Sequence, residues 1–569
     1  SAQPSTFSIH RSTQDICRSY LTRNLNSEEQ KETSFWVSTI LEKYLNHIID
    51  KESIKEISLL KNHCCSFLTN CILSDDIKGT LEFALGCIYY HLGENTKAQQ
   101  AFEKSLLLPS KTENDARKAK TFMYLGTIYR DFGKFELSKK FLEQSVEIYR
   151  EKFPNQQINI ARILMHLGNV YKDLSDPEKA KETLEESLLI FQQNPDNKAG
   201  LPRVLAYLGT VYRELGQYKK AQELLEKSVS IYNKQPNNPL GLALSLARLG
   251  NLYRELGDYE KAKSCLEKSL DIYRKNSSKN NVNFGWVLSY LGSVYGDLGY
   301  YEKAKEFFEE GLAIHQKNYK EDNINVGWVL TYLGCTYLTL NDYENAKNCL
   351  EKSLSIYEKN YKSAHISIGW ASLYLGIAHK HLGNSEKAEL FLNRSFYIYE
   401  NYFTENKVDI AWIFPYVGDI YRKLGTYIYF KPFNENLLAS YEKRYGECHL
   451  RTALVLKSIG EVYLMKKENE KAEVFLKRSL CIFEKINHPD RYRVLESLAF
   501  IYEQKTIEAG KNEQLKQTAI LKGQAIQYLS QALAITQTEF SHESAHVKRI
   551  KIRLGQLENG ISAYHLQNE

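Results

Sequence analysis

The sequence has few of the features that mark disorder, secretion or membrane insertion. Only 11 prolines occur among 569 residues, and the hydrophobic content of 43% with 25% charged residues excludes a disordered or fibrous chain. No run of about 18 apolar residues is present, and no charged segment followed by an apolar one opens the chain. We therefore expect neither a membrane span nor a signal peptide. Because the first residue is Ser1 and not Met, we expect a processed or excised product.

Cysteine pairing and strong charge are also missing. The ten cysteines form no CxxC pair, and several lie within apolar helical patterns. We interpret them as reduced core thiols of a cytoplasmic protein, with no disulfide or zinc framework. The net charge of +6 is small for this length and no block of like charge occurs, so the composition gives no reason to expect nucleic acid binding.

A repeated motif organises most of the chain. Leu-Gly-x-x-Tyr, or one close equivalent, recurs at intervals of 40 to 42 residues. Its glycines are Gly86, Gly126, Gly168, Gly209, Gly250, Gly292, Gly334, Gly376, Gly418 and Gly460. Degenerate copies follow around Leu498-Ala499 and Leu554-Gly555. Such regularity predicts a repeat array.

Each repeat has the pattern of two helices joined by a turn. In the copy around Gly250, apolar residues at helical spacing precede and follow Leu256-Gly257-Asp258-Tyr259. We expect Gly250 to be small because the two helices cross closely there, and Gly257 to be a left-handed cap that ends the first helix. Motif tyrosines such as Tyr129 and Tyr337 are predicted to be core residues.

The motif resembles the tetratricopeptide repeat. Leu-x-x-Leu-Gly-x-x-Tyr followed by Leu-Gly-x-Tyr-x-x-Ala is the signature of that family, and the period near 42 resembles its kinesin-light-chain type. The resemblance covers about residues 80 to 560. It implies an all-α, right-handed superhelical solenoid of about ten to twelve helical hairpins, whose first helices line a concave groove. It does not imply a kinesin subunit, since no heptad segment is visible.

Three regions depart from the repeat. Residues 1–80 have helical patterns without the motif, so we expect an N-terminal cap on an array that covers 81–560, with a tail at 561–569. Phe7 to Arg11 weakly resembles the segment that precedes such repeats in nucleotide-switch proteins, where this chain would be the sensor arm. We expect irregular hairpins near 426–445 and 505–525, with a change of direction at Pro432.

One catalytic pattern occurs. His542-Glu543-Ser544-Ala545-His546 is HExxH, which on a helix would direct two imidazoles at one metal, with Glu543 as base. In the repeat frame, however, it falls at a linker and the start of a first helix, where His449 and His488 occupy comparable places. No third ligand follows, and phosphate-binding loops and nucleophile motifs are absent from the sequence. We predict a non-enzymatic protein without metal or cofactor.

A tryptophan series recurs with the repeat. Trp286, Trp328, Trp370 and Trp412 each stand six residues before the motif glycine and follow Gly or Ala. On a helix this position lies opposite the core face, where the resemblance places the groove. The tryptophans are either anchors for a bound peptide or side chains that pack on the linker of the neighbouring repeat, for which the small residue makes room.

A basic series complements them in the earlier repeats. Arg130, Lys172, Arg213 and Arg254 stand four residues after the glycine, and Arg162 and Arg203 six before it. Acidic residues follow the first series directly, so local ion pairs on a solvated face are the alternative to ligand binding. The predicted binding residues are Trp286, Trp328, Trp370, Trp412, Arg162, Arg203, Asn169, Arg213, Asn251 and Arg254.

These patterns favour a scaffold that binds a peptide or partner helix, acidic and with aromatic anchors. The sensor arm of a nucleotide switch is one alternative. A second is an RNA-binding repeat protein, which the 40 tyrosines suggest, although the repeat motif accounts for most of them.

Overall fold

The computed structural model describes residues 60–62, 64, 65, 68, 75–108, 115–174, 176–194, 200–234, 238–276, 282–319, 322–361, 365–404, 435–512, 514–540 and 542–559. Throughout these ranges the regular elements are α-helices, as expected for an all-α solenoid. The chain divides into two compact units, and the boundary falls between Tyr207 and Leu208. Unit 1 comprises Ser1–Tyr207 with Lys234–Asn238, and unit 2 comprises Leu208–Asn233 with Pro239–Glu569.

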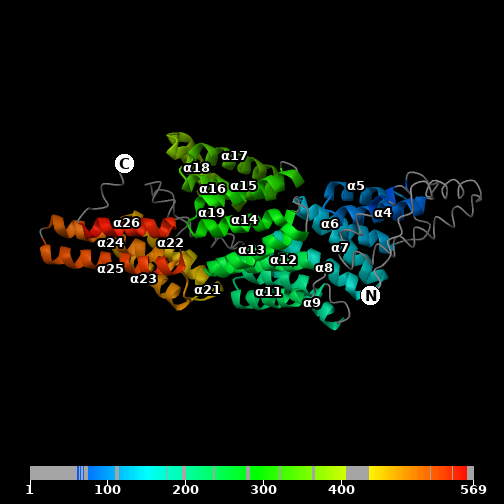
Figure 1. The fold of residues 1–569 in the computed structure, drawn as a ribbon, viewed down its shortest axis with the longest axis horizontal. Helices are drawn as coiled ribbons and strands as arrows, with labels where there is room; N and C mark the ends of the chain where they lie inside the picture. Colours follow the sequence, from blue (N-terminus) through cyan, green and yellow to red (C-terminus); the bar gives the residue numbers. More distant parts are fainter. Residues whose placement is uncertain are drawn as a thin grey trace, which may run out of the picture. The chain divides into compact units, whose positions relative to one another are not determined.

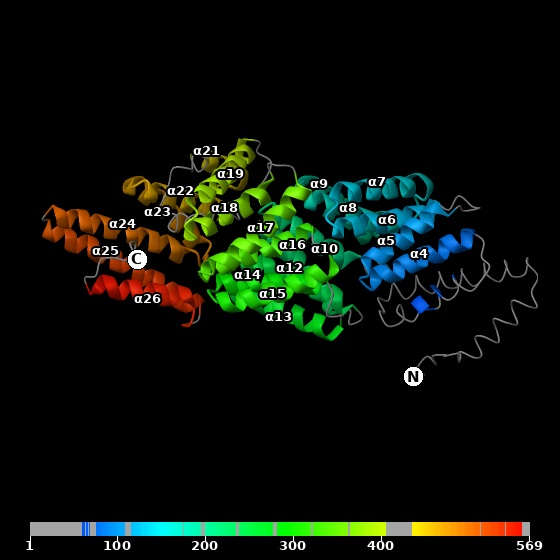
Figure 2. The same ribbon diagram turned by 90° about the horizontal axis from the view of Figure 1, so that it is seen from above.

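The helices form antiparallel pairs, which Figures 1 and 2 show from two directions. Unit 1 contains α4 (Asp75–His91), α5 (Asn95–Leu107), α6 (Asp115–Asp131), α7 (Phe135–Lys152), α8 (Gln157–Asp173) and α9 (Pro177–Gln193). Helix α10 (Leu201–Glu214) spans the boundary between the units.

Unit 2 continues the pairs. It contains α11 (Tyr218–Asn233), α12 (Pro239–Glu255), α13 (Tyr259–Asn276), α14 (Val282–Asp297), α15 (Tyr301–Asn318), α16 (Ile324–Thr339), α17 (Tyr343–Asn360), α18 (Ile366–His381) and α19 (Ser385–Thr404). After residue 434 follow α21 (Glu435–Tyr445), α22 (Leu450–Met465), α23 (Asn469–Lys485), α24 (Arg491–Lys511), α25 (Leu515–Glu539) and α26 (Ala545–Glu558).

The motif glycine is small because a helix crosses directly over it. A Cβ atom on Gly168 would lie 2.6 Å from Cγ of Leu184, and one on Gly250 would lie 2.8 Å from Cγ of Leu266. Both leucines belong to the second helix of the same repeat. The turn glycine Gly257 has φ +77°, the left-handed conformation expected of a helix cap. Both packing predictions are confirmed.

Hydrogen bonds join each repeat to the one before it. The motif tyrosine donates to a glutamate on the preceding second helix, from Tyr253 to Glu226 at 2.8 Å and from Tyr337 to Glu309 at 2.6 Å. The ring of Tyr253 is buried as predicted, whereas that of Tyr337 is only half-buried. The motif tyrosine therefore packs through its ring and connects repeats through its hydroxyl.

Several predictions concern residues outside the described ranges. These are Trp412, Pro432, the segment 426–434, residues 7–11 and the tail. Of the predicted cap, Leu60 and Cys64 are buried in a cluster with residues of α4, α5 and α6. None of the described helices has the length and apolarity needed to cross a membrane.

Candidate interaction surface

Tryptophans on successive first helices of unit 2 pack against one another. The rings of Trp286 on α14 and Trp328 on α16 meet edge to face, with centroids 5.2 Å apart. The series continues through Tyr332, which lies 4.2 Å from Trp328 and 4.9 Å from Trp370 on α18. We name Trp286, Trp328, Tyr332 and Trp370 the aromatic ladder. The Trp286–Trp328 and Tyr332–Trp370 contacts join adjacent first helices, whereas Trp286 also packs on His315 of α15, with centroids 4.9 Å apart. These contacts are made to helices and not to a linker.

The rungs of the aromatic ladder differ in exposure. Trp286 and Trp328 are half-buried, whereas Trp370 is only 2% exposed. The small residue before each tryptophan is explained by a different contact, which is made by the second helix of the same repeat. The carbonyl of Gly327 accepts a hydrogen bond from Ser353 at 2.7 Å, and a Cβ there would meet Ile356 at 3.1 Å. These glycines therefore permit close approach of the second helix of their own repeat.

The basic series also joins neighbouring repeats. Arg130 lies 3.1 Å from Asp131 beside it and 3.6 Å from Asp173 on the next first helix. Arg213 pairs with Glu255 on the next first helix. Arg254 reaches Asp297 at 2.9 Å.

We name these cross-repeat pairs the ionic ladder: Arg130–Asp173, Arg213–Glu255 and Arg254–Asp297. The arginine side chains are 16 to 22% exposed. The predicted local pairs are present, but the face is less solvated than expected because each guanidinium group also contacts the following repeat.

Unit 1 contains a positively charged cluster. Arg130, Arg162 and Arg203 act on His166, and Arg203 also acts on His91. Burial, followed by the charges of Arg130, Arg203 and Arg162, lowers the pKa of His166 to about 3. Burial and Arg203 lower the pKa of His91 to about 4. Nε2 of His91 and Nδ1 of His166 are buried without a hydrogen-bond partner among the described residues. Neutral imidazoles and guanidinium groups thus lie close together in unit 1.

The two predicted asparagines have different surroundings. Asn169 on α8 is only 5% exposed. Asn251 on α12 is half-buried, and its Oδ1 accepts from Nε of Arg254 at 3.3 Å. Asn251 thereby orients a member of the ionic ladder.

The HExxH residues do not lie on one helix. His542 and Glu543 are exposed in the turn before α26, where Glu543 pairs with Lys548 at 2.7 Å. His546 is buried in the first turn of α26, and Ser544 caps that helix through the amide of His546. Among the described residues, no three His, Cys, Asp or Glu side chains are grouped to hold a metal. The geometry supports the linker interpretation.

Within unit 2, the turns of middle repeats contact the helix starts of later repeats, which the sequence did not lead us to expect. Nε2 of His449 lies 2.9 Å from the carbonyl of Gly216, 233 residues away. His488 meets the carbonyl of Glu255 at 3.3 Å, and His546 that of Asp297 at 3.1 Å. The shared linker position of the three histidines was visible in the sequence, but nothing there indicated their partners.

Comparison with known proteins identifies the repeat. The tetratricopeptide repeat family matches residues 79–151, 159–234, 205–275, 241–317 and 283–359. Residues 79–151 and 159–359 are tetratricopeptide repeats. The family prediction is thus confirmed. Residues 328–396 also match a family described as anaphase-promoting complex subunit 5.

Similar solved structures include repeat proteins of low identity. BtubC (BKLC) from P. vanneervenii is 22% identical with a TM-score of 0.34, and the match covers 39% of this chain and 89% of that one. A putative kinesin light chain from Podosopora anserina is 24% identical with a TM-score of 0.31, covering 35% and 95%. A Rap protein complexed with competence and sporulation factor is 14% identical with a TM-score of 0.49, covering 64% and 98%. No curated protein matches the sequence significantly.

Tetratricopeptide repeats in tandem stack into an extended surface to which each repeat contributes the same helix positions. Here those positions hold the aromatic ladder in unit 2 and the cationic cluster in unit 1. The chain is accordingly a protein-interaction scaffold.

Proposed function

We propose that this scaffold binds an acidic peptide or partner helix on the concave face lined by its first helices, with aromatic groups of the ligand packing on Trp286 and Trp328. The observation that carries the proposal is the partial exposure of these two indoles within a continuous aromatic ladder. Their rings are held by Trp–Trp contact before a ligand arrives, and such fixed aromatic side chains lose little conformational entropy on binding.

The remaining predicted residues have graded roles in this proposal. Within unit 1, Arg162 and Arg203 form a separate contact for acidic groups, supported by the low pKa of His166, which both arginines help to lower. Arg213 and Arg254 contribute less to the ligand because Glu255 and Asp297 already compensate their charges. Trp370 is buried and packs on Tyr332, which in turn packs on Trp328, so it supports the half-buried indoles.

We also propose a reducing, cytoplasmic location. The eight cysteines within the described ranges are all free thiols. Desolvation raises the pKa of several, including that of Cys349 to about 11, so these thiols resist thiolate formation and oxidation.

The test uses fluorescence anisotropy with a library of acidic peptides that each contain one aromatic residue. For peptides that bind, W286A/W328A should weaken affinity at least tenfold, as expected for anchor residues. Tyr397→Ala is the matched control, because Tyr397 is a 66% exposed aromatic residue of a second helix. Equal loss in both variants, or none in W286A/W328A, would contradict the proposal.

A second pair of measurements tests the charge. R162A/R203A should weaken peptide affinity and reduce its dependence on salt, whereas R150A, which removes an exposed arginine of α7, should change neither. Single-stranded RNA serves as the competing probe. If RNA binds and acidic peptides do not, the proposed ligand class is wrong.

A further inference from the structure

The turns after α10, α12 and α14 are covered by the starts of α22, α24 and α26. The turn glycines Gly216, Gly257 and Gly299 have φ of +73°, +77° and +79°. A Cβ on Gly257 would overlap Pro489 and lie 3.0 Å from Nε2 of His488, and one on Gly299 would lie 2.8 Å from Oγ of Ser544. We name these three turns and three helix starts the docked edge.

The same turn is open in two other repeats. Gly93 and Gly383 have φ of +78° and +79°, and a Cβ on either would meet nothing within 4 Å. The left-handed turn therefore does not by itself bring the coverage seen at the docked edge.

Carbonyl groups at the ends of three first helices are satisfied by the docked side chains. Arg451 donates to the carbonyls of Arg213 at 3.0 Å and Glu214 at 2.8 Å, and Ser544 donates to that of Leu298 at 2.7 Å. Backbone carbonyls at a helix C-terminus lack partners within the helix and carry partial negative charge. Here they face the N-termini of later helices, which carry partial positive charge.

The histidines are held in one tautomer by their local backbone. Nδ1 of His449 accepts from the amide of Arg451 at 3.2 Å, and Nδ1 of His488 accepts from the amide of Asp490 at 3.2 Å. Nε2 must then bear the proton and donate it to the carbonyl of Gly216 or Glu255. A second proton on Nδ1 would oppose the backbone N–H at either site, and at His449 it would also remove the side-chain cap of α22.

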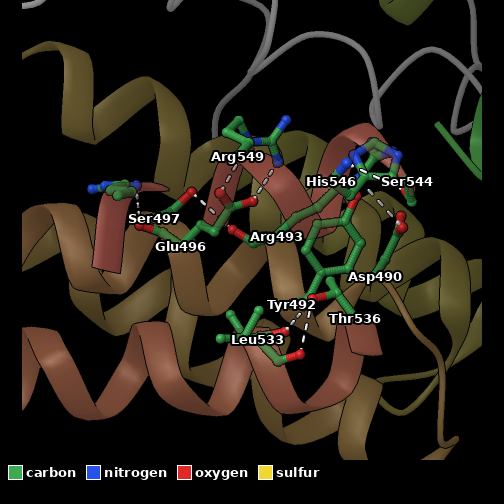
Figure 3. A network of polar contacts seen from close by, with 12 residues as sticks. Asp490, Tyr492, Arg493, Glu496, Ser497, Leu533, Thr536, Ser544, His546 and Arg549 are labelled. Atoms are coloured by element: carbon green, nitrogen blue, oxygen red, sulfur yellow. Dashed lines mark hydrogen bonds and ion pairs between the residues drawn. The ribbon is translucent and has the colours of Figure 1, made fainter. Parts of the chain in front are cut away.

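His546 reaches the same state differently. Its Nε2 lies 3.1 Å from the carbonyl of Asp297, while Nδ1 is buried without a partner among the described residues. Figure 3 shows His546 beside Ser544 at the start of α26, with Tyr492 and Asp490 nearby. A proton on Nδ1 would be a buried, unsatisfied charge.

We propose that the docked edge is a releasable contact, held by neutral His449, His488 and His546 and opened when these imidazoles are protonated. Opening would uncover the turns of the middle repeats and free the first helices of the last repeats from them.

Some of the charges around the histidines lower their pKa values and others raise them. Burial lowers the pKa of His546 to about 3, with Arg493 and Arg549 contributing and Glu496 opposing. Burial lowers the pKa of His488 too, although Asp490 and Asp297 oppose it. Arg549 is itself neutralised by Glu496 at 2.7 Å, as Figure 3 shows.

His449 and two nearby carboxyl groups complete the titratable set. Burial lowers the pKa of His449, which stacks between Tyr218 and Tyr445 beside Arg451. The pKa of Asp490 is lowered despite burial by Arg493 and His488, while burial raises that of Asp297. The lowered pKa of Asp490 weakens docking as the pH falls and acts with the histidines, whereas the raised pKa of Asp297 acts against them.

The sign follows from proton linkage. The released imidazoles return toward their ordinary pKa near 6.5, so the released form binds protons more tightly than the docked form. Docking is therefore strongest above pH 6.5 and weakens as the pH falls below it. For His546 alone, lowering the pH from 7.5 to 5.5 should raise the opening equilibrium constant about tenfold.

The experiment is amide hydrogen exchange on the full chain at pH 7.5 and 5.5, corrected for intrinsic exchange rates. Protection at the turns 214–217, 255–258 and 297–300 and at the helix starts 449–453, 488–493 and 544–548 should fall at least tenfold at the lower pH. Unchanged protection would overturn the proposal. In H449Q/H488Q/H546Q, whose glutamine side chains can still donate to the carbonyls, this pH response should disappear, and its persistence would also overturn it.

Two matched controls separate docking from general destabilisation. His365→Gln changes a histidine that caps α18 through Ser367, and it should leave the pH response intact. Gly257→Ala should expose the docked edge even at pH 7.5, whereas Gly383→Ala, with the same backbone strain in an open turn, should not. Indistinguishable protection in the two glycine variants would show that the covering contacts do not hold the edge.

Discussion

The ionic ladder and the aromatic ladder join successive first helices by different chemistry. On α6, α10 and α12, arginines four residues after the motif glycine pair with carboxylates of the following repeat, whereas the equivalent Lys172 of α8 pairs with Asp173 beside it. At the equivalent positions of α14 and α16 stand Gly296 and Leu338, and tryptophans six residues before the glycine make the contact. The comparison shows that the repeat requires contact between its first helices and leaves the chemistry of that contact free.

The two solutions differ in what they expose to a ligand. Each arginine of the ionic ladder is compensated by a carboxylate, and partly exposed ion pairs contribute little net stability because desolvation offsets attraction. The aromatic ladder removes apolar area from water at every rung and still leaves Trp286 and Trp328 half-buried. In unit 2 the same side chains therefore make a stabilising contact and form the surface that we propose for ligand binding.

The largest expected effect is at the buried end of the aromatic ladder. Trp370→Ala should destabilise the protein by about 3–5 kcal/mol, because it removes an almost fully buried indole and leaves a cavity beside Tyr332. Denaturant unfolding followed by circular dichroism measures this loss. Trp370→Phe, which keeps part of the ring, should lose less, and a loss under about 1 kcal/mol for the alanine variant would contradict the packing role.

The ionic ladder should be more tolerant. Arg130→Met should cost about 2 kcal/mol at pH 7.5, because Asp131 loses its cation and Asp173 keeps only Lys172, while both carboxylates remain about four-fifths buried. Arg150→Met is the matched control, since the Arg150–Glu186 pair is about half exposed and should matter little. Equal losses of stability in the two variants would show that an ion pair between first helices stabilises the protein no more than an ordinary surface ion pair.

The pH should separate the two ladders. Burial raises the pKa of Asp131 above its ordinary 3.8, and Arg130 opposes the increase. Without Arg130 the folded pKa rises further, so the carboxyl group is neutralised sooner as the pH falls, and the penalty of Arg130→Met should shrink. His166 acts in the same direction, since Arg130 also helps to lower its pKa.

Unfolding at pH 7.5 and 4.5 checks this difference. The penalty of Arg130→Met should be smaller at the lower pH, while that of Trp370→Ala should be the same at both. A constant penalty for Arg130→Met would mean that the carboxyl groups near it are already neutral or fully solvated.

Sequence reasoning succeeded where contacts are local and repeated. The motif glycines, the turn glycine and the buried tyrosine rings follow from helical period and close crossing within one repeat, and Gly168 and Gly257 behave as expected. The partner of Trp286 could not be derived in the same way. A helical face gives the direction of a side chain but not its distance from the next repeat, so packing on Trp328 and ligand binding stayed open.

The docked edge shows a second limit. Gly257 and Gly383 occupy the same motif position and the same backbone conformation, yet only Gly257 is covered. Coverage depends on how far the repeats curve over 233 residues, which accumulates from small rotations at every repeat interface. The residues near Gly257 and Gly383 therefore do not indicate which of the two turns is covered.

The smallest effect concerns the point where one ladder gives way to the other. Gly296 occupies the arginine position on α14, and a Cβ there would meet only Ala304 at 3.9 Å, so a side chain fits. Thr339, five residues after the next motif glycine, is the position of the absent carboxylate. Gly296→Arg with Thr339→Glu should extend the ionic ladder by one rung, with a coupling energy of at most about 1 kcal/mol in a double-mutant cycle. Gly296→Arg alone should stabilise the protein only through the higher helix propensity of arginine, and Gly296→Ala measures the effect of replacing the glycine separately. A coupling of zero would mean that the ionic ladder depends on the spacing of the earlier first helices as well as on its residues.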